Sequence, residues 1–178
     1  MRPTSFTFLT LVLFCLFVQT VQAGEGPTGN DPIPIRIEKT DDGFRLLRSG
    51  EPHFIKGAVF WGNPNGRHPL SELAECGANS IRCGGRNIDA ILDEAARIGL
   101  SVTVGLRMRM EAVHGFDYDD EEAVHEQFEQ IRKQVLRYKD HPALLMWGVG
   151  NELSMGYKNR NVWNAVNDVA RAIHELDP

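Results

Sequence analysis

One carboxyl follows a fully apolar stretch of this sequence. Residues 143–149 (ALLMWGV) form that stretch, and Asn151 and Glu152 come just after it. A carboxyl placed after an apolar strand, beside Trp147 and Met155, is expected in a setting that favours the protonated form a general acid needs. The Asn151 amide can donate a hydrogen bond to a hydroxyl. The pair is therefore a candidate for acid/base chemistry; the alternative is that it caps the following helix.

Other candidates follow expected strands in the same way. Trp61 and Asn63 come at and after the end of the run 54–61 (FIKGAVFW), and Arg82 lies near the end of the next run. Arg82 offers a fixed cation that could orient a carboxylate, although a structural salt bridge is the alternative. The indole rings of Trp61 and Trp147 could stack on sugar rings, with packing in the core as the alternative.

No motif indicates a metal or a cofactor. The six histidines show no metal-ligand spacing, and neither a G-x-G-x-x-G nor a G-x-x-x-x-G-K-[ST] loop follows any apolar run. A G-x-S-x-G nucleophile elbow is also missing. We therefore expect chemistry carried by side chains alone.

Strands and helices are expected to alternate four times after residue 53. Apolar runs predict strands over 54–61, 79–83, 100–106 and 143–149, and helical spacing predicts helices over 69–76, 88–98, 119–139 and through 162–176. An alternating segment over 35–47 with a turn at 41–43 predicts a β-hairpin before them. This order predicts an α/β fold, with a parallel sheet and helices packed outside it.

Two architectures share that order, the (β/α)8 TIM barrel and the doubly wound open sheet. The missing nucleotide loop favours the barrel, and the hairpin could close its bottom. A full barrel usually needs ~250 residues. We therefore expect residues 35–178 to form only the first four βα units, a truncated half with strand order 1-2-3-4 and unpaired edges prone to association. Barrel active sites lie at the carboxyl ends of the strands, where 61–63, 82–85, 107–109 and 150–152 are placed.

The first residues predict export. A basic start, an apolar run over 6–18 and small residues up to Ala23 are typical of a secretory signal peptide over 1–23. The run is short of the ~20 residues of a membrane anchor, so we expect cleavage near Ala23, a secreted or periplasmic protein, and no membrane association afterwards. Residues 24–34 (GEGPTGNDPIP) predict a flexible segment.

The charge pattern excludes some partners. The net charge is −5 with acidic and basic residues interspersed, and no basic stripe predicts nucleic-acid binding. Cys76 and Cys83 are separated by a strand that spans roughly 13 Å, too far for a disulfide, so we expect two buried free thiols.

Residues 137–152 (RYKDHPALLMWGVGNE) resemble the fourth-strand signature of the clan of retaining (β/α)8 glycoside hydrolases. The run is most similar to glycoside hydrolase family 2, with the pattern R-x-x-x-HP-S-(apolar)3-W-S-x-G-N-E, and also to the cellulase-like family 5. Residues 77–82 (GANSIR) resemble the second-strand G-x-N-x-x-R of that clan, and residues 55–57 resemble its first strand. The resemblance implies that Glu152 is the acid/base, that Asn151 contacts the 2-hydroxyl of the sugar, and that Arg82 supports the nucleophile.

The implied function is a retaining O-glycosyl hydrolase acting on a β-linked oligo- or polysaccharide, with two carboxyls ~5 Å apart and no metal. Residues 83–85 (CGG) replace the usual Ser-His-Tyr-Pro of family 2, which disfavours a galactosidase-type substrate and leaves cellulase-like, mannanase-like and glucanosyltransferase-like relatives open. The seventh-strand nucleophile is not in this sequence, so we expect this piece to be inactive alone. The alternatives are a non-catalytic carbohydrate-binding protein or pseudoenzyme, a glucanosyltransferase-like transglycosylase, and an unrelated open-sheet domain.

Overall fold

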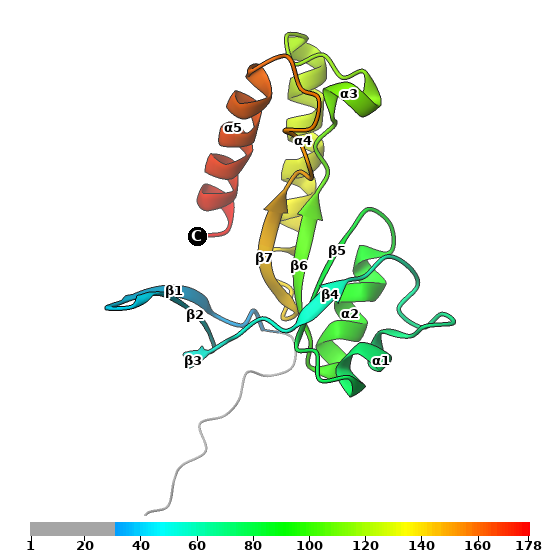
Figure 1. Ribbon diagram of the computed structural model, residues 1–178, viewed down its shortest axis with the longest axis vertical. Helices are drawn as coiled ribbons and strands as arrows, with labels where there is room; N and C mark the ends of the chain where they lie inside the picture. Colours follow the sequence, from blue (N-terminus) through cyan, green and yellow to red (C-terminus); the bar gives the residue numbers. More distant parts are fainter. Residues whose placement is uncertain (1–30) are drawn as a thin grey trace, which may run out of the picture.

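The computed structural model describes residues 31–178. The expected signal peptide and most of segment 24–34 lie outside the described residues. A three-stranded antiparallel sheet comes first along the chain (Figure 1). Its strands are β1 (Ile35–Thr40), β2 (Gly43–Arg48) and β3 (Glu51–Pro52). The predicted hairpin is therefore confirmed, with one short extra strand.

The second sheet holds four parallel strands in the sequential order β4-β5-β6-β7 within residues 31–178. They are β4 (Gly57–Val59), β5 (Ser80–Gly84), β6 (Ser101–Leu106) and β7 (Leu144–Val149). The helices between and after them are α1 (Leu70–Glu75), α2 (Ile88–Ile98), α3 (Glu111–His114), α4 (Glu121–Tyr138) and α5 (Asn161–Leu176). No strand is out of order, so the chain forms four consecutive βα units of a TIM barrel wall, and the open-sheet alternative is wrong.

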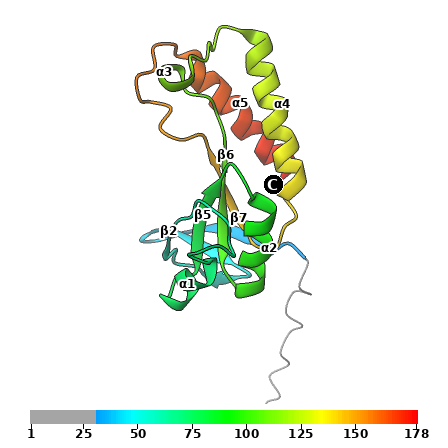
Figure 2. The ribbon, with the colours of Figure 1, turned by 90° about the vertical axis from the view of Figure 1, so that its right-hand side faces the viewer.

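One face of the parallel sheet packs against helices. Val102 and Val104 of β6 are fully buried, as are Ile91 and Leu92 of α2. Each such side chain contributes about 1.5–3 kcal/mol when it leaves water. Figures 1 and 2 show α4 and α5 running side by side beyond the carboxyl ends of β6 and β7. The helices thus fix the positions of the strand ends.

The other face of the sheet carries polar and small residues. Arg82, Thr103 and Gly105 alternate with the buried apolar positions of β5 and β6. A Cβ added to Gly148 would lie 3.8 Å from the Arg82 Nε atom and from Thr103 Cγ2, so these residues share one face. This face is the interior side of the barrel wall.

A β-bulge decides which β7 side chains reach that interior face. Val102 pairs with Leu144, but the next residue, Thr103, pairs with Met146, so Leu145 is an extra residue. Because side chains alternate along a strand, one inserted residue moves every later side chain to the opposite face. Trp147 therefore pairs with Val104 and lies on the helix side.

The antiparallel sheet lies at the amino ends of the parallel strands. Arg48 Nη2 donates to the Pro142 carbonyl, just before β7, at 3.4 Å. The His53 Nε2 atom lies 3.2 Å from Ser101 Oγ, at the start of β6. The hairpin sheet therefore meets the amino ends of the parallel strands, whereas β1 and β2 extend away from them (Figure 1). That the hairpin closes the bottom of a barrel stays a prediction.

Strand β4 is shorter than predicted from the run 54–61. The Asn79 side chain takes the place of a strand neighbour there: its Oδ1 accepts from the Lys56 amide at 2.8 Å, and its Nδ2 donates to the Phe54 carbonyl at 2.9 Å. Hydrogen bonds to a side chain replace the backbone ladder, so residues before Gly57 are not strand. Phe54 is 81% exposed as a result.

Three further expectations need correction. Helix α4 begins at Glu121 rather than at residue 119, and its cap is Asp120, whose Oδ1 accepts from the Ala123 amide at 3.0 Å. Helix α3 was not expected, because four residues are too few to show a helical period. Cys76 is exposed at the end of α1 and Cys83 is buried, so only one of the two free thiols is buried. In residues 31–178, no helix combines the length and the apolar character needed to cross a membrane.

Candidate active site

A cavity of about 310 Å³ lies at the carboxyl ends of β5, β6 and β7. Its lining includes Trp61, Arg82, Arg107, His114 and Asn151. Trp61 is 70% exposed, so its indole is available to a ligand. A larger hollow of about 470 Å³ lies between α4 and α5, away from the strand ends. Of these two cavities, only the one at the strand ends is lined by residues that the sequence analysis named as candidates.

Arg82 and Asn151 meet in this cavity, as the sequence predicts. Arg82 Nη2 donates to Asn151 Oδ1 at 3.1 Å and to the Gly150 carbonyl at 3.5 Å. Gly148 lies beside Arg82 on the sheet, where an added Cβ would be 3.8 Å from Arg82 Nε. Because Arg82 occupies the amide oxygen of Asn151, the amide nitrogen points elsewhere and remains a donor for a ligand. Asn151 is thus oriented by a side chain of β5, two strands away from β7 in the sheet, and a fixed orientation is what a recognition residue requires.

Glu152 follows in a turn of unusual backbone geometry. Its φ angle is +51°, and that of Gly150 is +69°. A non-glycine residue with positive φ is uncommon and persists only where the surrounding structure holds it, often at functional sites. The Glu152 carbonyl accepts from the Met155 amide at 2.9 Å, and Leu153 is buried beneath the turn.

The helix-cap alternative for Asn151-Glu152 is wrong, because α5 begins only at Asn161. The Glu152 side chain is exposed and does not line the cavity formed by residues 31–178. The apolar setting expected around this carboxyl is therefore not formed by the described residues. Met155, expected beside this carboxyl, is itself 56% exposed, and the Trp147 indole bonds to Asp177 instead.

Trp147 and Asn63 are not brought to the cavity. The Trp147 indole Nε1 donates to Asp177 Oδ2 at 2.7 Å, behind β7, and its ring packs with the buried cores on the helix side. That is the core-packing alternative. Asn63 Oδ1 accepts from the Asn65 amide at 3.0 Å, which closes a local turn. The substrate-binding roles predicted for these two residues remain predictions without support from this geometry.

The structure adds residues that the sequence had not assigned. Arg107 directly follows β6, and His114 ends the short helix α3; both line the cavity. Glu111 Oε2 accepts from the amides of Lys158 and Asn159 at 2.8 and 3.0 Å, which ties the loop after β7 to α3. These bonds, that of Asn159 first, hold the pKa of Glu111 below its ordinary value. The place of Arg107 at a strand end was the only available signal.

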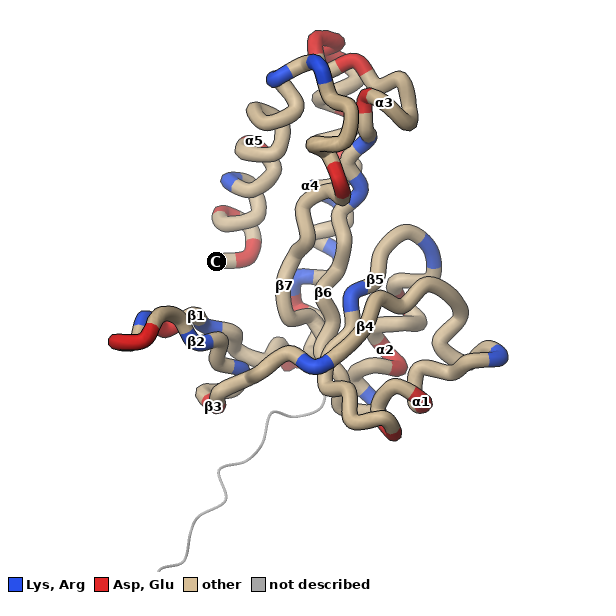
Figure 3. Tube along the Cα trace, in the orientation of Figure 1, with Lys and Arg blue, Asp and Glu red and all other residues tan. Residues whose placement is uncertain are grey.

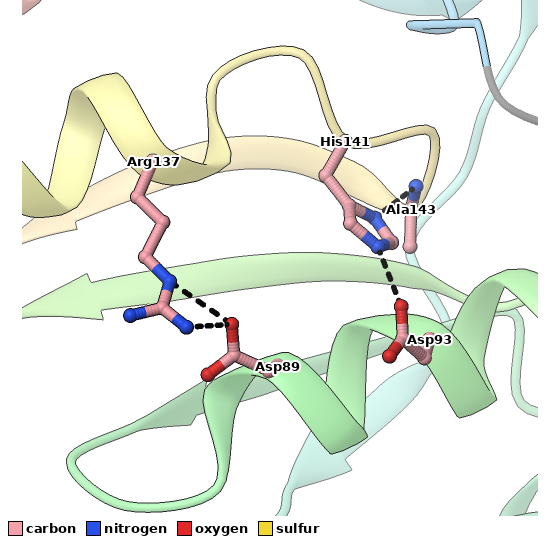
Figure 4. A network of polar contacts seen from close by, with 5 residues as sticks. All are labelled: Asp89, Asp93, Arg137, His141 and Ala143. Atoms are coloured by element: carbon pink, nitrogen blue, oxygen red, sulfur yellow. Dashed lines mark hydrogen bonds and ion pairs between the residues drawn. The ribbon is translucent and has the colours of Figure 1, made fainter.

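The charged residues of the 137–152 run divide between two places. Arg137 donates to Asp89 Oδ1 through Nε and Nη2 at 3.0 and 2.7 Å (Figure 4). His141 lies 3.3 Å from Asp93 Oδ1 through Nε2, and its Nδ1 accepts from the Ala143 amide at 3.2 Å. These contacts join the end of α4 and the start of β7 to α2. The first part of the run is therefore architectural, and only its last residues reach the strand-end rim.

Cys83 lines the cavity on the β5 side. Burial raises its pKa to about 11, so the thiol is protonated at neutral pH and is a poor nucleophile. Within residues 31–178, no group of three or more His, Cys, Asp and Glu side chains is arranged to hold a metal ion. The polar groups available at the cavity are guanidinium, amide, imidazole and, at its edge, one carboxyl.

The sequence profile described as "Glycosyl hydrolases family 2, TIM barrel domain" matches residues 89–177. Among solved structures, β-glucuronidase from Ruminococcus gnavus shares 18% identity and a TM-score of 0.57, covering 82% of this chain and 26% of its own. ScGas2 in complex with compound 7 shares 18% identity and a TM-score of 0.56, covering 83% of this chain and 36% of its own.

At this level of identity, the two structures establish similarity of fold alone. This chain spans about a third or less of their length, as the covered shares of 36% and 26% state. Comparison with curated proteins gives no match.

Proposed function

The chain belongs to the TIM barrel domain of the family 2 glycosyl hydrolases, and from this premise we propose that it supplies the acid/base half of a retaining O-glycosyl hydrolase active site. The proposed substrate is a β-linked oligo- or polysaccharide. Glu152 is the proposed acid/base, Asn151 the group that binds a hydroxyl next to the cleaved bond, and Trp61 a platform for a sugar ring.

One observation carries this proposal: the Arg82–Asn151 hydrogen bond of 3.1 Å at the cavity, with Glu152 next in the chain. It brings residues that are 69 positions apart onto one rim. A guanidinium that donates to a neutral amide, instead of pairing with a carboxylate, keeps its positive charge available at this rim. The arrangement leaves the amide nitrogen of Asn151, which lines the cavity, to donate to a sugar hydroxyl.

The proposed chemistry needs a second carboxyl. Glu152 would protonate the glycosidic oxygen while a carboxylate ~5 Å away attacks the anomeric carbon, and Glu152 would then deprotonate the water that releases the sugar. Arg82 is free of any carboxylate partner among the described residues, so it is available to orient that nucleophile. The second carboxyl would come from strands that complete the barrel, and residues 31–178 alone are proposed to be inactive.

A second candidate function has its own observation. Within residues 31–178, no Asp or Glu lines the cavity, although Arg82, Arg107, Trp61 and Asn151 do. This set could bind a carbohydrate without cleaving it. A non-catalytic carbohydrate-binding protein is therefore the competing proposal, and a transglycosylase would use the same carboxyl pair with a sugar acceptor in place of water.

The test is Glu152→Gln in a complete barrel that contains this chain. Losing a general acid costs ~10²–10⁴-fold in turnover of an unactivated glycoside. Aryl glycosides with good leaving groups need little protonation, so their glycosylation step should be spared, and added azide should restore the second step. Glu126→Gln on the exposed face of α4 is the matched control and should keep full activity.

Two results would decide against hydrolysis by this carboxyl. If Glu152→Gln cleaved the natural substrate at the unaltered rate, the acid/base assignment would be lost. If the unaltered complete barrel bound glycans but cleaved none, the carbohydrate-binding alternative would be correct.

Export is a separate proposal, based on residues 1–23 of the sequence. We expect a secreted or periplasmic protein that begins near Gly24. Amino-terminal sequencing of the protein recovered from the medium or periplasm checks this. A retained Met1 in a membrane fraction would contradict it.

A further inference from the structure

The cavity contains a pair of residues that the proposed reaction does not use. Arg107 Nη2 and His114 Nε2 lie 3.5 Å apart, and both residues line the cavity that Trp61 and Asn151 also line. Both side chains are exposed. Their relation to each other depends on which imidazole nitrogen carries the proton.

A backbone contact fixes that proton. The Met110 amide donates to His114 Nδ1 at 2.8 Å, so Nδ1 acts as the acceptor and carries no hydrogen. The proton of the neutral ring is then on Nε2. Arg107 Nη2 is also a donor only, because a guanidinium has no acceptor. The 3.5 Å contact is therefore between two donors, not a donor and an acceptor, and both N–H groups lack an acceptor there.

The neighbouring carboxylate does not supply the acceptor. Arg107 forms no ion pair within residues 31–178. Glu111, three residues from His114 on the same short helix, directs its Oε2 to the Lys158 and Asn159 amides. Figure 3 shows basic and acidic residues interspersed along the described chain. Among the described residues that line this cavity, however, none is an Asp or Glu that could pair with Arg107.

We propose that Arg107 and His114 form a subsite for an anionic group, a carboxylate or a sulfate ester, carried by a glycan whose ring lies against Trp61. This inference rests on the proposed function and names its substrate class, an acidic carbohydrate. An anionic oxygen placed between the two N–H groups accepts from both, and charge-assisted bonds of this kind are roughly twice as strong as neutral ones. Arg82 is already proposed to hold Asn151 and to orient the nucleophile, so Arg107 is the cation left for this role.

The experiment compares three ligands with the purified chain by NMR titration, following the Trp61 indole and the amides of 107–114. The ligands are methyl β-D-glucoside, methyl β-D-glucuronide and methyl β-D-glucoside 6-sulfate. We expect the two acidic ligands, or one of them, to bind at least about tenfold more tightly than the neutral one, the effect of one charge-assisted hydrogen bond. Which acidic ligand binds identifies the group as carboxylate or sulfate.

The variants assign the preference to the subsite. Arg107→Gln and His114→Phe should each bring the acidic ligands to the affinity of the neutral one. Arg36→Gln, an exposed position on β1, makes the same change in net charge far from the cavity and should keep the preference.

The outcomes separate this inference from the proposed function. Equal binding of all three ligands, or a preference that survives Arg107→Gln, would overturn the anionic subsite and leave the glycan site intact. If none of the three ligands shifted the Trp61 or 107–114 signals, the subsite and the carbohydrate site at this cavity would both be overturned.

Discussion

Two regions of this molecule use basic side chains in opposite ways. On the face between α2 and α4, Arg137 lies 2.7 Å from Asp89 and His141 lies 3.3 Å from Asp93. On the strand-end rim, Arg82 and Arg107 have no carboxylate partner within the described residues. The first region completes its charges within the chain and joins two helices. The second leaves cations available, which is the condition of a site that awaits a ligand or a further segment.

The largest difference in the free energy of unfolding is expected at Gly150, where the strand-end rim holds the backbone at a positive φ. Gly150 has a φ of +69°, and a Cβ there would lie 2.6 Å from Leu153 Cδ1. Gly99, which ends α2, has a φ of +79° but open space around an added Cβ. Gly99→Ala should cost only the conformational penalty, about 1–2 kcal/mol, whereas Gly150→Ala adds a packing clash of about 1–3 kcal/mol.

Urea unfolding of the two alanine variants measures this difference. Equal losses in the two would mean that Leu153 moves aside freely and that the turn carrying Glu152 is not held by packing.

Next in size is the difference between a paired and an unpaired arginine. A double-mutant cycle on Arg137 and Asp89 should give a coupling of about 0.2–1 kcal/mol, because both side chains are more than half exposed. Arg82→Met should change stability by less than about 0.5 kcal/mol, since it gives up only bonds to neutral acceptors. A larger loss for Arg82→Met than for Arg137→Met, by chemical denaturation, would break the contrast between the regions.

The smallest expected effect depends on pH. The pKa of Glu111 is lowered from 4.5, first by the Asn159 amide and then by that of Lys158, while the pKa of Glu94 is lowered mainly by its hydrogen bond to Arg97. A lowered carboxyl pKa stabilises the fold above the unfolded pKa, and this contribution is lost as the pH falls through the folded pKa. The loss of folding stability caused by Glu111→Gln or by Glu94→Gln should therefore become smaller below about pH 4.5.

Salt separates these two carboxyls. Glu94 interacts with the Arg97 cation, so its contribution to stability should be lost in 0.5 M NaCl, where the screening length is roughly 4–5 Å. Glu111 accepts mainly from neutral amides and should keep most of its contribution. Unfolding curves from pH 7 to pH 3 at both salt concentrations check this. Identical salt responses would show that Glu111 acts through Lys158 charge rather than through the loop backbone.

Local spacing predicted much of the fold. The 88–98 helix was predicted residue for residue, because Ile88, Ile91, Leu92 and Ala95 share one face and Gly99 stops the helix in the left-handed conformation. Sequential strand order also followed from short connections. The length of β4 did not, because it depends on the Asn79 side chain, which lies some 25 residues from its partner Phe54.

The site was predictable only in part, for a related reason. Arg82 and Asn151 could be placed together because parallel strands end on one rim, and the structure brings them within 3.1 Å. The position of Trp147 could not be predicted. Simple alternation from Leu144 would place its side chain on the interior face, and the extra residue Leu145 moves it to the helix side. A β-bulge depends on how two strands pair, so the local sequence of one strand does not predict it.

The sequential order of β4 to β7 also bears on how the chain is made. Each strand pairs with the one synthesised just before it, and Gly57 to Val149 never requires a later segment to insert between earlier ones. Pairing between consecutive strands closes shorter loops than pairing between distant segments would, which lowers the entropic cost of assembling the sheet. As the chain leaves the ribosome, each new βα unit finds its docking surface already assembled, and the wall can grow in the order of translation.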